Sequence, residues 1–391
     1  MTREIYLDNS ATTKICEQAL KTYIEISENN YGNPSSRHSR GKNAEDIMTS
    51  SRNTILRSIG ASDGTLVFTS CGSEANNLAI FGRAYSKERY VKNRAKIITT
   101  EGEHASVDIP LDKLKEKGFE IARIPTRAGK LDMEVLEREL TENTVLVTMM
   151  MVNNETGALY DIASVSKLIK RKCKDCVLHC DATQSYMKVP FSVKTLGIHM
   201  LTISSHKIEG PKGLGALWID KELVKQKGVS PMIFGGGQES GFRSGTENVP
   251  GIAAFASACE YCKSNMSEHI SKTEGLRSYL LEKLSSCAEL NEIKPVLPES
   301  HAPHILNLTM PHIKSEVMLN HLSSLGIYVS SGSACSSHDA HISNALTSFG
   351  LTEKEADCSI RISFSHTNTK EDVDALCVGL TEGLSKLART K

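Results

Sequence analysis

The sequence has no net charge and no long apolar segment, and each absence excludes a class of protein. Its 46 lysines and arginines equal its 46 aspartates and glutamates, which argues against a surface that binds a polyanion such as nucleic acid. No apolar run approaches the ~20 residues needed to cross a bilayer. Residues 1–8 lack the apolar core of a signal peptide. We therefore expect a globular protein with no membrane and no nucleic-acid partner.

Cysteines are frequent, and their context argues for free thiols. The sequence contains eleven cysteines and no export signal, so we expect a reducing compartment, the cytoplasm, and mostly free thiols. Two groups have the close spacing of metal ligands: Cys173, Cys176 and Cys180, and the pair Cys259 and Cys262. Because Cys180 falls inside an expected strand and the pair on an expected helix, we expect no metal site.

Apolar strands alternate with helical patterns over the first part of the chain. We expect strands at 4–7, 65–69, 95–100, 119–124, 144–152, 177–181, 200–203 and 213–219. This alternation is typical of an α/β fold with a mostly parallel sheet. Two helices follow, at about 249–264 and 269–287. The polar, proline-bearing stretch 294–303 then suggests a domain seam, and a smaller α+β domain follows it.

A lysine and an acid follow two strands of this pattern. Lys207 comes after strand 200–203, and lysine is the side chain that forms a Schiff base with the aldehyde of pyridoxal phosphate. Asp181 closes strand 177–181, and a buried carboxylate beside a pyridine nitrogen keeps that nitrogen protonated. Two parallel strands joined by a crossover would bring both side chains to one sheet edge. Alone, each is more often a surface lysine or a turn acid; together they indicate a cofactor site.

Other strand ends carry groups that suit the rest of such a cofactor. Ser73 opens a helix directly after a strand, where free backbone N–H groups and the helix dipole favour an anion. Ser204 and His206 flank the lysine and offer hydrogen bonds to a phosphate. His104 follows another strand and could stack on a ring or move a proton. Ordinary helix capping remains an alternative for Ser73 and for His104.

Two residues near the C-terminus suggest a nucleophile and a carboxylate ligand. Cys335 lies in a run of glycine, serine and alanine, a loop that could present a thiolate. Arg361 lies inside the apolar strand expected at 359–365, and its planar fork suits a substrate carboxylate. The alternatives are an incidental loop cysteine and a structural ion pair.

Taken together, these motifs resemble those of the cysteine desulfurases, a group of class V aminotransferases. The likeness runs in order from Tyr6 almost to the C-terminus. It is carried by His104, Asn153-Asn154-Glu155, Asp181-Ala182-Thr183-Gln184-Ser185, Ser205-His206-Lys207, Arg243-Ser244-Gly245-Thr246-Glu247-Asn248, Ser331-Gly332-Ser333-Ala334-Cys335 and Ser359-Ile360-Arg361.

The resemblance implies a homodimer of fold type I, the pyridoxal phosphate-dependent transferase fold. A large cofactor domain would span 15–259. A small domain would combine 1–14 with 260–391 and carry the cysteine loop and the arginine. The substrate would be L-cysteine, and a sulfur-acceptor protein, such as an iron–sulfur scaffold, would take the product sulfur. The C-terminus lacks the tail by which some relatives dock such a scaffold. The resemblance therefore does not establish an iron–sulfur scaffold as the acceptor.

The resemblance also implies a role for each candidate residue. Lys207 would bind the cofactor aldehyde, with Asp181 at the ring nitrogen, Gln184 at the phenolic oxygen and His104 stacked on the ring. The phosphate would lie against Cys71, Gly72, Ser73, Ser204, His206 and the partner subunit's Thr246. The substrate carboxylate would be held by Asn33, Asn154 and Arg361, and Asn154 would also contact the cofactor. Cys335 would attack the sulfur, giving alanine and a persulfide.

The sequence departs from the family at the expected phosphate loop. Cys71 stands where glycine is usual, which adds a β-carbon close to the phosphate, and Ser73 stands where threonine is usual. Two other functions use the same motifs: a selenocysteine lyase, and a sulfur-carrier protein that keeps the fold without the catalysis.

Overall fold

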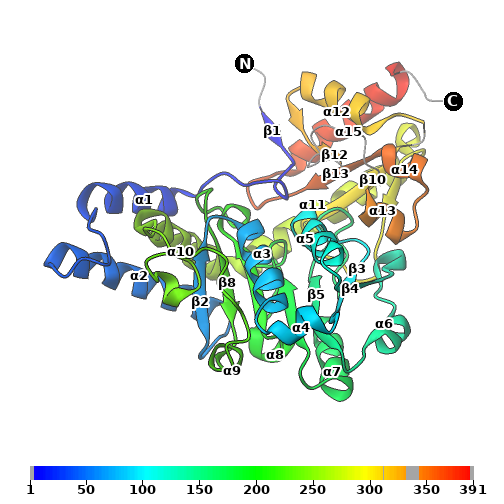
Figure 1. Ribbon diagram of the computed structural model, residues 1–391. Helices are drawn as coiled ribbons and strands as arrows, with labels where there is room; N and C mark the ends of the chain where they lie inside the picture. The colour runs from blue at the N-terminus through cyan, green and yellow to red at the C-terminus, as the bar shows by residue number, and fades with distance from the viewer. Residues whose placement is uncertain (1–3, 311, 332–342, 388–391) are drawn as a thin grey trace.

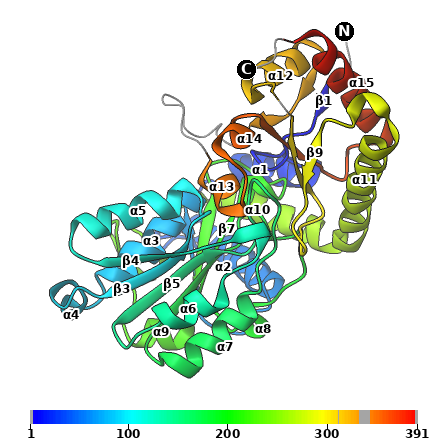
Figure 2. The same ribbon diagram turned by 90° about the vertical axis from the view of Figure 1, so that its right-hand side faces the viewer.

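A seven-stranded sheet lies at the centre of the computed structural model, which describes residues 4–310, 312–331 and 343–387 (Figures 1 and 2). The strands stand in the order β2 (Thr65–Thr69), β8 (Gly215–Ile219), β7 (Met200–Ser204), β6 (Val177–Asp181), β5 (Thr144–Met150), β3 (Lys96–Thr100) and β4 (Glu120–Ile124). Neighbours are parallel from β7 to β4, whereas β8 is antiparallel to both β2 and β7. The predicted α/β fold with a mostly parallel sheet is confirmed.

Helices cover both faces of this sheet, so its strands are apolar on both sides. Along β2, Leu66 and Phe68 pack into one hydrophobic cluster and Val67 into another, because successive side chains point to opposite faces. The cluster around Val67 is closed by α3 (Gly72–Ala84) and α5 (Ala105–Glu116). The other is closed by α1 (Glu17–Asn29), α2 (Ser39–Ser58), α6 (Met133–Glu139), α7 (Ile162–Lys172) and α10 (Val249–Ser264).

A separate hydrophobic cluster forms around a four-stranded antiparallel sheet near the C-terminus. Its strands stand in the order β12 (Ser330–Ser331), β13 (Ser359–Ser363), β10 (Ile305–Thr309) and β9 (Lys294–Val296), beside α11 (Met266–Ser286), α12 (Ser315–Ser324) and α15 (Lys370–Lys386). The N-terminal strand β1 (Ile5–Tyr6) pairs in parallel with β11 (Ile327–Tyr328), so the start of the described chain joins this unit (Figure 1).

The structure also contains short elements that the sequence patterns did not predict. They are α4 (Glu88–Lys92), α8 (Val193–Leu196), α9 (Lys221–Lys225), α13 (Asn344–Phe349), α14 (Glu353–Asp357) and β9, within the stretch that was expected to be an irregular seam. Each is too short to show a helical or strand period.

The apolar side chains of α1 are only partly buried. Ala19 is buried, whereas Leu20, Tyr23 and Ile24 are 44%, 37% and 48% exposed.

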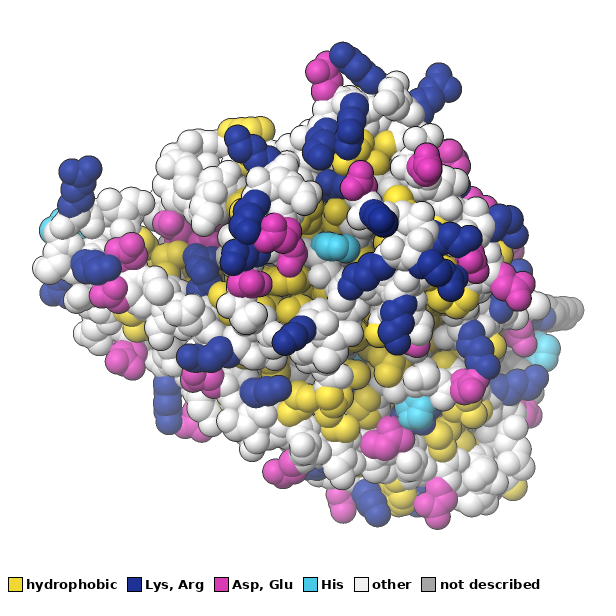
Figure 3. Space-filling view, turned by 90° about the horizontal axis from the view of Figure 1, so that it is seen from below, with side chains coloured by type: hydrophobic (Ala, Val, Ile, Leu, Met, Phe, Trp, Pro, Cys, Tyr) yellow, Lys and Arg dark blue, Asp and Glu magenta, His cyan; other side chains and the backbone are white. Residues whose placement is uncertain are grey.

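Charged side chains of both signs are mixed on the surface. Basic and acidic side chains are interspersed over the face in Figure 3, with no broad region of one sign. Within the described ranges, no helix combines the length and the apolar character needed to span a bilayer.

Candidate active site

Lys207 and Asp181 lie at the same edge of the large sheet. Asp181 is the last residue of β6, and Lys207 ends a single 3-10 turn (Ser205–Lys207) that follows β7. The two strands are parallel neighbours, with Asp181 opposite Thr202. The Lys207 ammonium donates hydrogen bonds to the carbonyls of Ser10 and Ala11, the latter at 2.8 Å. The N-terminal segment therefore lies directly against the candidate cofactor lysine.

The carboxylate of Asp181 is held by hydrogen bonds that fix its direction. Asp181 is 6% exposed; it accepts from Nδ2 of Asn76 at 2.8 Å and from the backbone N–H of Thr183 at 2.9 Å. Asn76 stands one turn into α3 and also donates to Oγ of Ser106 at 2.8 Å. These hydrogen bonds hold the carboxylate in one orientation, as pairing with a ring nitrogen requires. Sequence reasoning missed Asn76, although it belongs to the polar turn that contains Ser73.

His104 caps α5 and is also close to the charged groups of the site. Its Nδ1 accepts from the backbone N–H of Ser106 at 3.1 Å, which assigns the ring proton to Nε2. Burial lowers the pKa of His104, and the positive charges of Lys207 and Arg361 lower it further, while Asp181 opposes them. The imidazole is therefore neutral at physiological pH, with Nε2–H as a donor.

The turn between β2 and α3 provides the features of an anion site. Cys71, the residue before α3, has an extended backbone (φ −172°, ψ 173°) that any residue adopts, so its β-carbon causes no strain. Ser73 is exposed in the first turn of α3. On the neighbouring β8, Gly215 permits close packing, because a β-carbon there would lie 2.5 Å from the carbonyl carbon of Cys71. Gly72 is less constrained, and a β-carbon there would meet Ser204 at an ordinary 3.5 Å.

Several buried polar atoms around this turn have no partner among the described residues, and they fit a phosphorylated ligand with an oxygen-bearing ring. These atoms are Oγ of Ser204, Oε1 of Gln184 and Oδ1 of Asn76. The other end of the Gln184 amide donates to the Ser10 carbonyl at 2.9 Å. Burial and nearby lysines, Lys207 first, lower the pKa of His206 to about 4, so it remains a neutral hydrogen-bonding group. The residues present therefore suit pyridoxal phosphate.

Arg361 forms the ion pair that the sequence left as an alternative. From β13, its Nη2 donates to Oδ1 of Asp8 at 2.8 Å, and its Nη1 donates to the backbone carbonyl of Asn154 at 2.9 Å. Its Nε is buried without a hydrogen-bond partner in the part of the chain that the structure describes. Asn154 and Arg361 are thus neighbours, and Nε–H remains available to a carboxylate.

Two other candidates lie in exposed loop segments rather than at the end of a strand. Asn33 is exposed in the loop between α1 and α2, where its side-chain oxygen accepts from the N–H of Ser35 at 2.9 Å. Thr246 is exposed in the segment before α10. Neither makes a hydrogen bond to another candidate residue within the described ranges. Cys335 lies outside the described residues.

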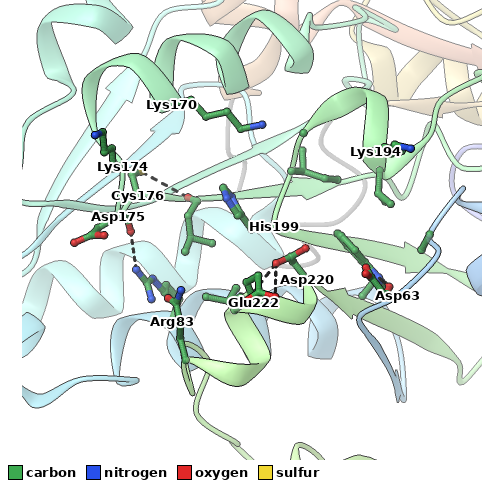
Figure 4. A pocket seen from close by; sticks show the side chains of 18 of the residues that line it. Asp63, Arg83, Lys170, Lys174, Asp175, Cys176, Lys194, His199, Asp220 and Glu222 are labelled. Carbon is green, nitrogen blue, oxygen red and sulfur yellow. Dashed lines mark hydrogen bonds between the residues drawn. The ribbon is translucent and has the colours of Figure 1, made fainter.

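A cavity of about 510 Å³ lies at the opposite edge of the sheet and contains none of the candidate residues (Figure 4). There the guanidinium of Arg83 donates to the Asp175 carbonyl at 3.0 Å, and Cys176 forms part of the wall. Every cysteine that the structure describes carries a free thiol. Among the described residues, no three His, Cys, Asp or Glu side chains gather as metal ligands.

Known proteins share both this sequence and this fold. The family model for aminotransferase class-V matches residues 5–376. The sequence is 36% identical to "Cysteine desulfurase IscS 1" of Archaeoglobus fulgidus over 95% of this chain and 94% of that protein. A solved NifS-like protein superposes with a TM-score of 0.90 at 35% identity, covering 98% of this chain and all of that one. "SspA in complex with cysteine" superposes with a TM-score of 0.80 at 29% identity, covering 94% of this chain and 100% of SspA. The chain therefore belongs to the class-V aminotransferase family and, within it, to the cysteine desulfurases.

Proposed function

We propose that this enzyme removes sulfur from L-cysteine with pyridoxal phosphate on Lys207, leaving L-alanine. The observation that carries the proposal is the meeting of Lys207 and Asp181 at one sheet edge, beside buried polar atoms that have no partner in the described part of the chain. When bound, pyridoxal phosphate supplies an aldehyde for the lysine and an electron-withdrawing ring. The chain's own residues bind and orient the reacting groups around it.

Each side chain has a task that follows from its contacts. Asp181, fixed by Asn76 and Thr183, would hold a proton at the ring nitrogen. His104 would stack on the ring with a donor kept at Nε2, because its Nδ1 accepts from Ser106. Gln184 would face the phenolic oxygen. The turn that contains Cys71, Gly72 and Ser73 would hold the phosphate, together with Ser204, His206 and the partner subunit's Thr246.

The substrate carboxylate and sulfur involve a second set of residues. Arg361, whose Nε–H has no partner among the described residues, binds the carboxylate with Asn154. Asn33 lies in an exposed loop and is not assigned this role. The Cys335 thiolate attacks the substrate sulfur. The sulfur–Cys335 bond forms as the carbon–sulfur bond breaks, so the sulfur stays on the enzyme as a persulfide and the carbon skeleton leaves, after protonation, as alanine. A sulfur-acceptor protein, such as an iron–sulfur scaffold, then takes the sulfur.

Exposed apolar side chains support a homodimer. Phe234 is 79% exposed in the segment that leads to Thr246, and Leu20 and Ile24 are exposed on α1. Met232, Ile233 and Phe234 are consecutive and all exposed, and a contiguous apolar patch of this kind is typical of an interface. We further propose that 15–259 form the cofactor domain, that 1–14 and 260–391 form the small domain, and that the enzyme acts in the cytoplasm, where its free thiols stay reduced.

Purified protein tests the proposal through its absorbance and its products. We expect a yellow protein that forms alanine and sulfide from L-cysteine. Lys207→Ala should lose the visible absorbance band, whereas Cys335→Ala should keep it and stop sulfide release. Cys287→Ser, at the end of α11, is the matched thiol control and should behave as the wild type. Sulfide release by Cys335→Ala at the wild-type rate would refute the role of Cys335. A much faster turnover of selenocysteine would instead identify a selenocysteine lyase.

A further inference from the structure

Behind Lys207 lies a second, smaller cavity whose residues the proposed reaction does not use. Its volume is about 50 Å³, and its wall includes Lys188, Glu209, His304 and His366 as well as Lys207. One water requires only ~10–15 Å³ of such volume, so the cavity has room for a small ion or a few waters.

Two of these side chains, Lys188 and His304, have no hydrogen-bond partner among the residues that the structure describes. Neither Nζ of Lys188 nor either ring nitrogen of His304 bonds to any residue in the described ranges. His304 is only 2% exposed. Buried polar groups are almost always hydrogen-bonded, and an isolated buried charge is costly. These three nitrogens therefore require a partner that the described chain does not supply.

The carboxylate in the wall is already engaged elsewhere. Oε1 of Glu209 lies 3.0 Å from Nδ1 of His366, whose Nε2 lies 3.2 Å from the hydroxyl of Tyr261. The His366 ring also stacks on His269, with ring centres 3.8 Å apart. Glu209 is thus committed to this aromatic side of the cavity rather than to Lys188.

The groups facing Lys188 and His304 are largely cationic. Burial and the charge of Lys207 lower the pKa of Lys188 to about 7, against smaller effects of Cys262 and Glu209. Burial also lowers the pKa of His304, and the charges of Lys188 and Arg361 lower it further. Like charges at short range in a poorly solvated site repel strongly. An anion in the cavity would favour the charged form of Lys188, whereas a neutral occupant such as water would not.

We propose that this cavity binds a monovalent anion of about the size of chloride between Lys188 and His304. The anion accepts hydrogen bonds from the Lys188 ammonium and from the ring nitrogen of His304 that carries a proton. Its negative charge stabilises the ammonium form of Lys188. The site lies beside the lysine of the proposed reaction but does not depend on that reaction.

Bromide, which has the charge of chloride and scatters X-rays anomalously, is the direct probe. Crystals of the holoenzyme soaked in sodium bromide should show an anomalous peak in contact with Lys188 and His304. The peak should persist in Lys170→Met, which removes a surface ammonium from α7 at the opposite sheet edge, and should be absent in Lys188→Met. Water alone in the cavity, or Lys188 turned onto Glu209 with no bromide peak, would overturn the proposal.

A solution measurement covers the case in which crystals are not obtained. Replacing sodium gluconate by sodium chloride at constant ionic strength should raise the midpoint of thermal unfolding of the holoenzyme, because a ligand that binds only the folded state stabilises it. The rise should be lost in Lys188→Met, or in His304→Phe if the first variant does not fold. An equal chloride effect in the wild type and a folded variant counts against the site.

Discussion

Glu239 joins the glycine-rich segment before α10 to the large sheet, and its removal should destabilise the enzyme. Its two carboxylate oxygens accept from Nη1 and Nη2 of Arg52, each at 2.8 Å, and one also accepts from the backbone N–H of Phe68 at 2.8 Å. The Glu239 side chain is 2% exposed and that of Arg52 26%. Arg52 also lies over the Phe68 ring, 4.7 Å from its centre. A largely buried, bidentate ion pair between Arg52 and Glu239 therefore fixes this segment against β2.

The size of the effect follows from what each substitution leaves behind. Removing one partner of a buried ion pair costs about 3–5 kcal/mol, because the remaining charge is left uncompensated. Arg52 is partly exposed and keeps a bond to the Leu66 carbonyl, so we expect about 3 kcal/mol for Glu239→Ala. Glu239→Gln keeps an acceptor for the Phe68 amide but loses the charge, and should cost roughly 1.5 kcal/mol.

Urea unfolding followed by circular dichroism measures these losses, and an exposed pair supplies the control. Glu45 pairs with Lys42 at 3.1 Å, but both side chains are more than half exposed, so Glu45→Gln should change stability by less than about 0.5 kcal/mol. Replacing both partners, as Arg52→Met with Glu239→Leu, should be less destabilising than Glu239→Ala alone, because no charge is left unpaired. Equal losses for Glu239→Ala and Glu45→Gln would refute the reasoning.

Three further predictions concern the cofactor edge of the sheet. Asn76→Ala removes the donor to Asp181 and should weaken cofactor binding by about 1.5–3 kcal/mol in a spectrophotometric titration; unchanged affinity would contradict the assigned role. Burial raises the pKa of Glu103 from 4.5 to about 8, so between these two pH values the folded state holds a proton that the unfolded state has lost. The stability of the wild type therefore falls as pH rises from about 4.5 to about 8. In urea titrations, Glu103→Gln should be more stable relative to the wild type at about pH 9 than at about pH 4. Gly215→Ala places a β-carbon 2.5 Å from the Cys71 carbonyl carbon and should release cofactor on gel filtration, whereas Gly275→Ala, with open space around it, should not.

The fold was largely predictable because its elements repeat a strong local signal. The strands that end at Asp181 and at Ser204 are short apolar runs, and the helices between strands show a clear apolar face. Short elements were missed for the converse reason. The helix Val193–Leu196 is a single turn fixed by the Ser192 cap and by contacts with α7, and a single turn has no period to read.

The site was predictable only where its residues follow strands. Lys207 and Asp181 share an edge because parallel strands end together, a rule that needs no contact information. Asn76 and Asp8 had no such signal, since their partners Asp181 and Arg361 lie 105 and 353 residues away along the chain. Cys71 stands where the family has glycine, and the sequence could not show whether its β-carbon fits. The backbone of Cys71 is extended, a conformation that tolerates a β-carbon.

The N-terminal segment links the two halves of the candidate site. Asp8 accepts a hydrogen bond from the guanidinium of Arg361. The backbone carbonyls of Ser10 and Ala11, two and three residues further on, accept hydrogen bonds from the Lys207 ammonium. The segment is itself fixed to β13, where the N–H of Ser10 donates to Oγ of Ser363 at 2.8 Å. Under the proposed function, a substrate carboxylate at Arg361 would share that cation with Asp8, and an aldehyde at Lys207 would draw its amine away from two carbonyls. Occupation of either position would therefore act on the same short stretch of chain, residues 8–11.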